Sequence, residues 1–257
     1  MIRVPYDKDG EAGFLLIPQP AHAMLSGLIA EHWATPLEPA HAIMLATTLH
    51  DIGWLRKDTL PLLNDEGAPL HFLDPTLEES GEMYIQCVVD VRAIDPYAAL
   101  LVKRHIETIF NSRVEHGRDS EDDVAPYLFR LQRHDKALRA ILADHPFYAR
   151  YSDENTIERN YRILRTCDFM SLFVCGAFTP RTITVPFSAE NPAQEVACEL
   201  VDSDTLRLTP SPLAVDELTV PLTVRYINKT HFGNAEVYAE AFQTAERMTL
   251  VKRIIAG

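Results

Sequence analysis

The sequence predicts a mainly α-helical fold with a small β element, because three zones of the chain differ in patterning. Residues 20–178 carry apolar side chains at helical spacing. Residues 1–19 resemble a short hairpin, since an Asp9-Gly10 turn signal separates the apolar runs IRV and GFLLI. Residues 181–230 are dense in Thr, Val and Pro, which predicts strands, and a last helix is expected over residues 234–255.

The length and composition predict one domain over residues 1–257. Of the 257 residues, 47% are hydrophobic and 24% charged, which is an ordinary globular balance with enough apolar surface for a core. Residues 20–178 are expected to form the helical core, and residues 181–257 a strand-rich extension packed on it. Prolines restrict this extension to edge strands or short ribbons that pair with the N-terminal hairpin. They are Pro186, Pro210, Pro212 and Pro221.

Charge and patterning argue against several classes of partner. With 37 acidic and 24 basic residues the net charge is -13, which disfavours nucleic acid and anionic membranes. A small anionic substrate stays compatible, since its site needs only a local group of Lys and Arg. The longest apolar run, residues 169–178, is about half the length of a membrane span. No signal-peptide pattern and no C-x-x-C pair occur, so a cytoplasmic location is expected; the oligomeric state is not indicated.

Four predicted helices place a metal-capable residue on their apolar stripe. These residues are His22, His50, His105 and Asp168. A single histidine in such a position is more often a hydrogen-bonded core residue. Asp168 is harder to accommodate, because an unpaired buried carboxylate costs several kcal/mol. It must be protonated, bound to a metal, or paired with one of the nearby arginines Arg159, Arg162 and Arg165.

The dipeptide His50-Asp51, at a predicted helix end, adds a specific geometry. Adjacent side chains at the end of a helix can reach the same ion. Together with His22 and Asp168 they make a mixed nitrogen and oxygen donor set. Such a set suits Mn, Fe, Co, Ni or Zn better than Ca, which prefers oxygen alone.

The order His22, His50-Asp51, Asp168 resembles the signature of the HD superfamily of metal-dependent phosphohydrolases, and HDIGW is similar to its core motif. The segments QPAHAMLSGLIAEHW, GAPLHFLD, DPYAALLVKRH and LRTCDFMSLFVCG resemble an uncharacterised bacterial branch of it. The resemblance implies an HD-like helical bundle in which these four residues hold a first metal. In two-metal members two further histidines hold a second ion, which implies roles for His105 and His71.

Other histidines are weaker candidates. His116 and His134 are alternatives for the second ion, but the look-alike pair His134-Asp135 lies among exposed residues and is interpreted as a solvated helix face. Trp54 stands where the superfamily often has Lys, which affects how an anion is held. The remaining histidines are predicted at the surface or in loops: His32, His41, His145 and His231.

A metal with an open position lowers the pKa of bound water toward ~7. We therefore expect a metal-dependent hydrolase acting on a phosphate ester or nucleotide-like small molecule, with one or two divalent ions. Asp51 and His105 are assigned to catalysis, and Lys103 and Arg104 to stabilising phosphoryl charge, with Arg56 and Lys57 as alternatives. Two other hypotheses stay open. One is an HD-type di-iron oxygenase, in which His71 and His105 must both converge on the site; the other is a non-catalytic metal-binding or sensory module.

Overall fold

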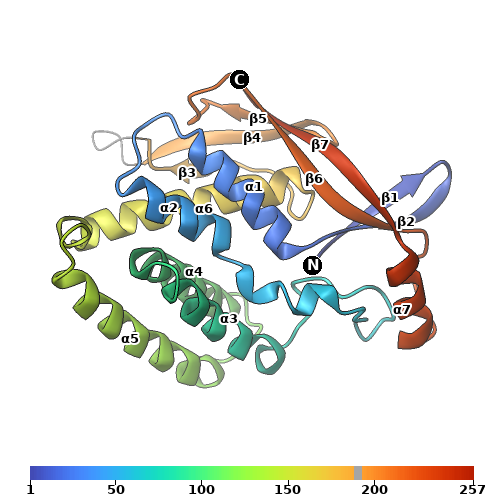
Figure 1. Ribbon diagram of the computed structural model, residues 1–257. Helices are drawn as coiled ribbons and strands as arrows, with labels where there is room; N and C mark the ends of the chain where they lie inside the picture. The colour runs from blue at the N-terminus through green and yellow to red at the C-terminus, as the bar shows by residue number, and fades with distance from the viewer. Residues whose placement is uncertain (188–192) are drawn as a thin grey trace.

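A curled seven-stranded sheet is covered on one side by helices in the computed structural model, which describes residues 1–187 and 193–257 (Figure 1). The helices are α1 Gln19–Glu31, α2 Ala40–Leu49, α3 Leu77–Arg92, α4 Pro96–Glu115, α5 Glu121–Ala143, α6 Glu154–Val174 and α7 Ala235–Thr244, with short 3-10 turns η1 Ile52–Trp54, η2 Lys57–Thr59 and η3 Ala149–Tyr151. The strands are β1 Ile2–Lys8, β2 Glu11–Ile17, β3 Ile183–Val185, β4 Gln194–Asp202, β5 Thr205–Thr209, β6 Glu217–Ile227 and β7 Glu246–Ala256.

The sheet joins the two ends of the chain. Its order is β1-β2-β6-β7-β5-β4-β3, with β5 and β7 parallel and the other neighbours antiparallel. The N-terminal hairpin forms as predicted, with Asp9 at φ 56° and Gly10 at φ 87° in the turn. Since β2 pairs with β6, the C-terminal strands extend the sheet that the hairpin begins. Helices α1 and α6 lie against the inner face of this sheet and connect it to the rest of the helical layer.

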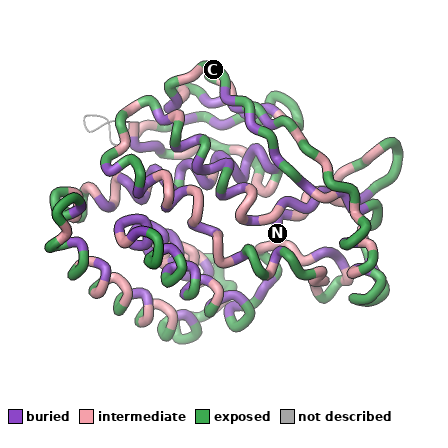
Figure 2. The backbone as a smooth tube through the Cα atoms, in the orientation of Figure 1, coloured by how far each residue is buried: buried purple, intermediate pink, exposed green. Residues whose placement is uncertain are grey.

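The prediction of a mainly α-helical fold with a small β element was wrong. Helices make up 48% and strands 23% of the described residues, so the architecture is mixed α/β, with a sheet large enough to form a full layer. The main buried core extends from Ile2 on β1 to Ile254 on β7 and includes the inner faces of the helices (Figure 2). A second, smaller cluster packs Tyr238 and Phe242 of α7 with Leu16 of β2.

The helix expected over residues 234–255 ends at Thr244, and the rest of that segment forms β7. Burial alternates along β7: Lys252 and Ile254 are buried, whereas Val251 and Arg253 are exposed. This period of two is that of a strand. The segment was interpreted as helical because α7 runs directly into it without a Gly or Pro to mark the change.

The expectation of short edge ribbons was also wrong for β6, which has 11 residues and lies inside the sheet. Pro221 has no N–H to donate, yet it occurs within this strand, opposite Val251 of β7. Strand β2 pairs only with residues 225–227 of β6. Pro221 therefore lies where β6 has a hydrogen-bonding neighbour on one side, so its missing donor disrupts no second ladder.

Helix α4 begins as its sequence predicts. The carboxylate of Asp95 accepts a hydrogen bond from the Ala98 N–H at 2.7 Å, and Pro96 occupies the first helical position.

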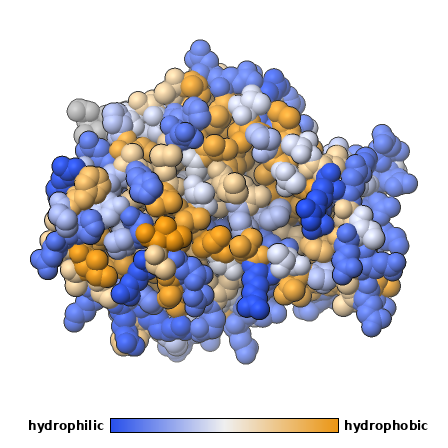
Figure 3. Space-filling model, in the orientation of Figure 1, coloured by the Kyte–Doolittle hydropathy of each residue, from blue (hydrophilic) through white to orange (hydrophobic). Residues whose placement is uncertain are grey.

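Among the described residues, no helix combines the length and apolarity needed to cross a lipid bilayer. The face seen in Figure 3 mixes hydrophilic and hydrophobic side chains.

Helices α1 and α2 approach closely at Gly27, which lies one turn beyond His22. A Cβ atom on Gly27 would come within 2.1 Å of the Thr48 Oγ1 and 3.2 Å of its Cβ. We expect Gly27→Ala to lower the free energy of unfolding, because overpacking costs about 1–3 kcal/mol, more than the roughly 1 kcal/mol that alanine contributes to helix propensity. Urea denaturation measures the change.

The double variant Gly27→Ala/Thr48→Ala should regain most of that stability, since it removes the clashing hydroxyl. Gly233→Ala serves as the control, because nothing lies within 4 Å of its added Cβ. A Gly27→Ala protein as stable as the parent would show that the two helices can separate without cost.

Candidate metal centre

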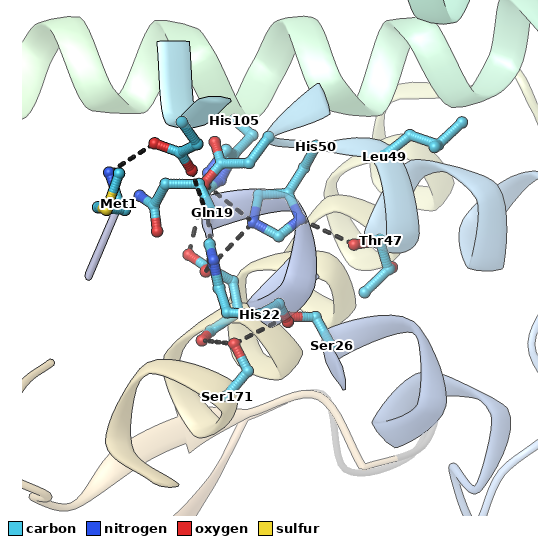
Figure 4. A network of polar contacts seen from close by, with 12 residues as sticks. Met1, Gln19, His22, Ser26, Thr47, Leu49, His50, His105 and Ser171 are labelled. Carbon is cyan, nitrogen blue, oxygen red and sulfur yellow. Dashed lines mark hydrogen bonds and ion pairs between the residues drawn. The ribbon is translucent and has the colours of Figure 1, made fainter. Parts of the chain in front are cut away.

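Three side chains from three helices meet in the interior. His22 comes from the first turn of α1, His50 directly follows α2, and Asp168 lies in α6. The Asp168 Oδ1 is 3.3 Å from the Nε2 of each histidine, and the three candidate ligand atoms lie within 4.8 Å of one another. Figure 4 shows the rings of His22 and His50 turned toward the same point, with His105 and Gln19 beside them.

Two further predicted residues border this group. The Asp51 Oδ2 lies 3.6 Å from the Nε2 of His22 and 3.8 Å from that of His50. The His105 Nε2 lies 3.9 Å from the Asp168 Oδ2, and its ring contacts His50 edge to face, with 5.1 Å between centroids. The structure thus gathers five of the six predicted metal ligands, which we call the His/Asp cluster: His22, His50, Asp51, His105 and Asp168.

Backbone contacts orient the cluster. The His50 Nδ1 lies 2.8 Å from the Thr47 carbonyl, and donating to that oxygen leaves the Nε2 lone pair directed at the carboxylates. On the other side, the Ser171 hydroxyl donates to the Asp168 carbonyl at 2.8 Å and accepts from Ser26 of α1 at 2.9 Å. This link ties α6 to the helix that carries His22.

The charges of the cluster act mainly on one another. Burial lowers the pKa of His50, but the charges of Asp51 and Asp168 outweigh burial and raise it to about 9. Burial would raise the pKa of Asp168, yet the neighbouring histidines, His50 foremost, hold it far below its usual range. Burial raises the pKa of Asp51, against the opposing effect of His50 and His22. In the metal-free protein, a proton on His50 therefore offsets one of the two carboxylate charges.

The donor set fits a divalent transition metal. All five side chains belong to residues at most 7% exposed, and the contacts of Asp168 run to histidines. Arg159 and Arg165 contact Asn160 and Phe169 instead. Three buried ring nitrogens lack a hydrogen-bond partner among the described residues: the Nδ1 of His22 and His105 and the Nε2 of His50. Two histidine nitrogens and a carboxylate oxygen on one point resemble the mixed shells of Zn, Fe, Mn, Co or Ni.

The predicted phosphate-binding cations lie elsewhere. The buried Lys103 ammonium contacts Glu107 at 2.9 Å and Asp135 at 3.1 Å, so it faces α5. Arg104 pairs with acids of α4 and α6, including Glu158 at 3.0 Å. In the described part of the chain neither side chain contacts the cluster, because positions two or one residue before His105 point to other sides of α4.

Among the described residues, the alternative cations Arg56 and Lys57 do not contact the cluster either. Lys57 lies over the Trp54 ring, 5.8 Å from its centroid, and Arg56 is exposed. Trp54 itself is buried and packs edge to face on Tyr84.

His71, the sixth predicted ligand, is also held apart. Its ring packs on Phe72, and its Nδ1 accepts a hydrogen bond from the Leu73 N–H at 3.2 Å. The backbone N–H of His71 donates to the Asp74 carboxylate at 2.8 Å. No contact within residues 1–187 and 193–257 joins it to the cluster. The ligand set required for the di-iron hypothesis is therefore not assembled.

Burial lowers the pKa of His71 to about 4, which makes its effect on stability testable. The unfolded chain takes up a proton near pH 6.5, whereas the folded protein resists it until about pH 4. The contribution of the neutral His71 ring to the free energy of unfolding is thus fully present above pH 6.5. It is lost as the pH falls from 6.5 through about 4. We expect the unfolding free energy of the parent to fall by about 2 kcal/mol more than that of His71→Asn between pH 7 and 4, as measured by urea denaturation. His41→Asn, at an exposed position, should follow the parent.

The remaining histidines are dispersed. His134 and Asp135 are both partly buried. The Asp135 carboxylate accepts hydrogen bonds from Lys103 and Arg139, so this pair is not a fully solvated helix face. His116 caps the end of α4 through its own turn. His145 is not free either, because its Nδ1 accepts the N–H groups of Phe147 and Tyr148.

Two residues near the cluster escaped the sequence analysis. Gln19 is buried, its Oε1 has no partner among the described residues, and Figure 4 shows it beside the histidines. Arg165 was considered only as a partner of Asp168. It is exposed and lies over the Phe169 ring, and its charge helps burial to lower the pKa of His105. The signal that could have found it is its position one turn before Asp168 on α6.

Comparison with known proteins gives one result. A family model described as "Protein of unknown function (DUF3891)" matches residues 7–229. No curated protein and no solved structure matches the chain.

The assignment to the HD superfamily is therefore wrong. The family that matches is a different one, and the seven-stranded sheet that packs on α1 and α6 departs from the helical bundle that the short motifs implied. A His-Asp dipeptide at a helix end is a local pattern and does not specify the layer against which the helices pack.

Proposed function

The chain belongs to the DUF3891 family, and we propose that it is a metal-dependent hydrolase whose ion is held by His22, His50 and Asp168. One observation carries this proposal: two carboxylates and three histidines converge in the interior with no lysine or arginine contact to neutralise them among the described residues. A buried carboxylate without a cation is costly, and a divalent ion removes that cost.

Three ligands leave coordination positions for water and substrate, as in catalytic rather than structural sites. Mn, Fe, Co, Ni and Zn all suit two imidazoles and one carboxylate, and a single ion accounts for these three ligands. Bound there, the ion supplies Lewis acidity and increases the acidity of water beside it.

The other cluster residues then have distinct roles. Asp51 faces His22 and His50, and its raised pKa makes it a better proton acceptor than an ordinary aspartate, so it serves as the general base. Burial lowers the pKa of His105 to about 3, so its ring stays neutral and donates one N–H to substrate or product. Arg165 has no ion pair in the described part of the chain and supplies the positive charge that a phosphate ester requires.

The burial of the cluster favours a second function, a non-catalytic metal-binding module. His22 and His50 are only 1% exposed, so substrate needs a path that opens toward Asp51, His105 and Asp168. A structural metal would need no such path. The two functions differ in a measurable property, because only the hydrolase exchanges solvent at the ion.

The test begins with protein stripped of metal by a chelator and reloaded with Mn, Fe, Co, Ni or Zn in turn. We expect one ion per chain and hydrolysis of p-nitrophenyl phosphate or bis-p-nitrophenyl phosphate that appears only after reloading. His50→Ala should lose both metal and activity, whereas His41→Ala, at an exposed histidine of α2, should keep both. A protein that binds one ion stoichiometrically but hydrolyses no ester would support the non-catalytic module. Failure to bind any ion would contradict both functions.

A further inference from the structure

A second site of opposite charge lies between α3 and α5. A surface pocket of about 280 Å³ is lined by Arg92, at the last position of α3, and by one face of α5. The α5 residues are Arg130, Arg133, His134 and Ala137. Counted from Arg130, they lie 0, 3, 4 and 7 residues along the chain, a spacing that places side chains on a single side of a helix. The small side chain of Ala137 leaves room at the end of this row.

The charges around the pocket are not balanced by the protein. Arg130 is engaged, since its guanidinium makes a bidentate contact with the Glu82 carboxylate. Arg92 and Arg133 make no ion pair or hydrogen bond in the part of the chain that the structure describes. Other arginines of the helical layer form ion pairs, for example Arg104, Arg113 and Arg139. In a chain of net charge -13, two unpaired guanidinium groups on one small hollow are left for an external anion.

His134 completes the polar lining. Partial burial, and then the charges of the three arginines, lower its pKa, so at neutral pH its ring is uncharged and presents one N–H donor. The three arginines line the same pocket as His134, so they can act on a single bound group. The carboxylate of the neighbouring Asp135 binds Lys103 and Arg139 instead, so it does not repel an anion in this pocket.

We propose that this arginine pocket, formed by Arg92, Arg130, Arg133 and His134, binds a phosphate group. Planar guanidinium groups match the oxygen geometry of phosphate and bind it through paired N–H donors. The volume is at the small end of ligand pockets, which fits inorganic phosphate or pyrophosphate, or the phosphoryl end of a larger molecule. The pocket shares no residue with the His/Asp cluster, so this inference stands or falls independently of the proposed hydrolase activity.

Calorimetric titration of the metal-stripped protein at low ionic strength tests the proposal with two probes, pyrophosphate and phenyl phosphate. We expect saturable binding of at least one probe, weakened tenfold or more in Arg92→Gln/Arg133→Gln and less in each single variant. Arg247→Gln removes the same charge from an exposed position on β7 and should leave the affinity within twofold of the parent. Removing the metal beforehand prevents phosphate from binding at the cluster instead.

The relative affinity of the probes identifies the source of the phosphate group. Tighter binding of pyrophosphate assigns a free inorganic anion, and tighter binding of phenyl phosphate assigns a phosphate ester. If neither probe binds, or if the double variant binds as the parent does, the proposal is overturned. Arg92 also sits where a cation favours the helix end. A purely structural role there would lower the melting temperature of Arg92→Gln without changing probe affinity, which equally overturns the proposal.

Discussion

Replacing Asp168 by alanine is expected to weaken metal binding by roughly a thousandfold or more. Even residues that merely support a ligand change metal affinity 10–100-fold, and Asp168 is the carboxylate that both His22 and His50 approach at 3.3 Å. Without it, two imidazoles face each other with only Asp51 to balance their charge. Competition with a chromogenic chelator measures the affinity for Zn or Co.

The same substitution should destabilise the metal-free protein by about 3–5 kcal/mol, because His50 then loses the main partner of its buried positive charge. Asp168→Asn keeps the shape and is expected to lose metal as Asp168→Ala does, which separates ligand loss from cavity formation. Asp65→Asn, on an exposed loop, is the matched control. Unchanged metal content in Asp168→Ala would show that the His/Asp cluster is not the metal site.

Asp51→Asn is expected to reduce ester hydrolysis 10²–10⁴-fold while metal stays bound, since removing a general base costs about that much. Asp51 lies 3.6 and 3.8 Å from the two histidine nitrogens, outside the 3.3 Å contacts that Asp168 makes. Asparagine fills the same volume but cannot accept a proton. Steady-state rates, normalised to the metal content of each sample, measure the effect.

His105→Gln provides the comparison for this experiment. It removes a ring that contacts Asp168 only at 3.9 Å, so a smaller loss of rate, with metal retained, is expected. If Asp51→Asn hydrolysed ester at the parent rate, Asp51 would have no role as the base. If it lost its metal, Asp51 would instead be a fourth ligand.

Helical periodicity was sufficient to single out three residues of the cluster. Each of His22, His50 and Asp168 stands where its helix needs an apolar side chain, and a polar group in that position must be satisfied by another element. The sequence could not show the same for Lys103. It too is buried, but on the α5 side of α4, where it pairs with Asp135 across 32 residues of chain. Periodicity places a side chain on a face of its own helix and does not tell which helix covers that face.

The fold class illustrates the same limit at larger scale. Thr and Val marked β6 as strand-forming, but its partner β7 lies in a segment that continues directly from α7 and has no turn signal between them. Whether such a segment forms a helix or a strand depends on the neighbours with which it can pair, here β5 and β6 on its two sides. Pro221 similarly looked incompatible with an interior strand until the short pairing with β2 showed that one side of β6 is open.

The sequence by itself determined the hairpin turn, the capped start of α4 and the polar residues of the helical stripes, because each depends on residues within a few positions of one another. Only the tertiary structure decided that the four stripe residues converge with Asp51, that Lys103 and Arg104 are neutralised elsewhere, and that Arg92 meets the arginine row of α5. These outcomes depend on contacts between segments tens to hundreds of residues apart. The energy of such contacts comes from packing and charge pairing across elements, which no local pattern encodes.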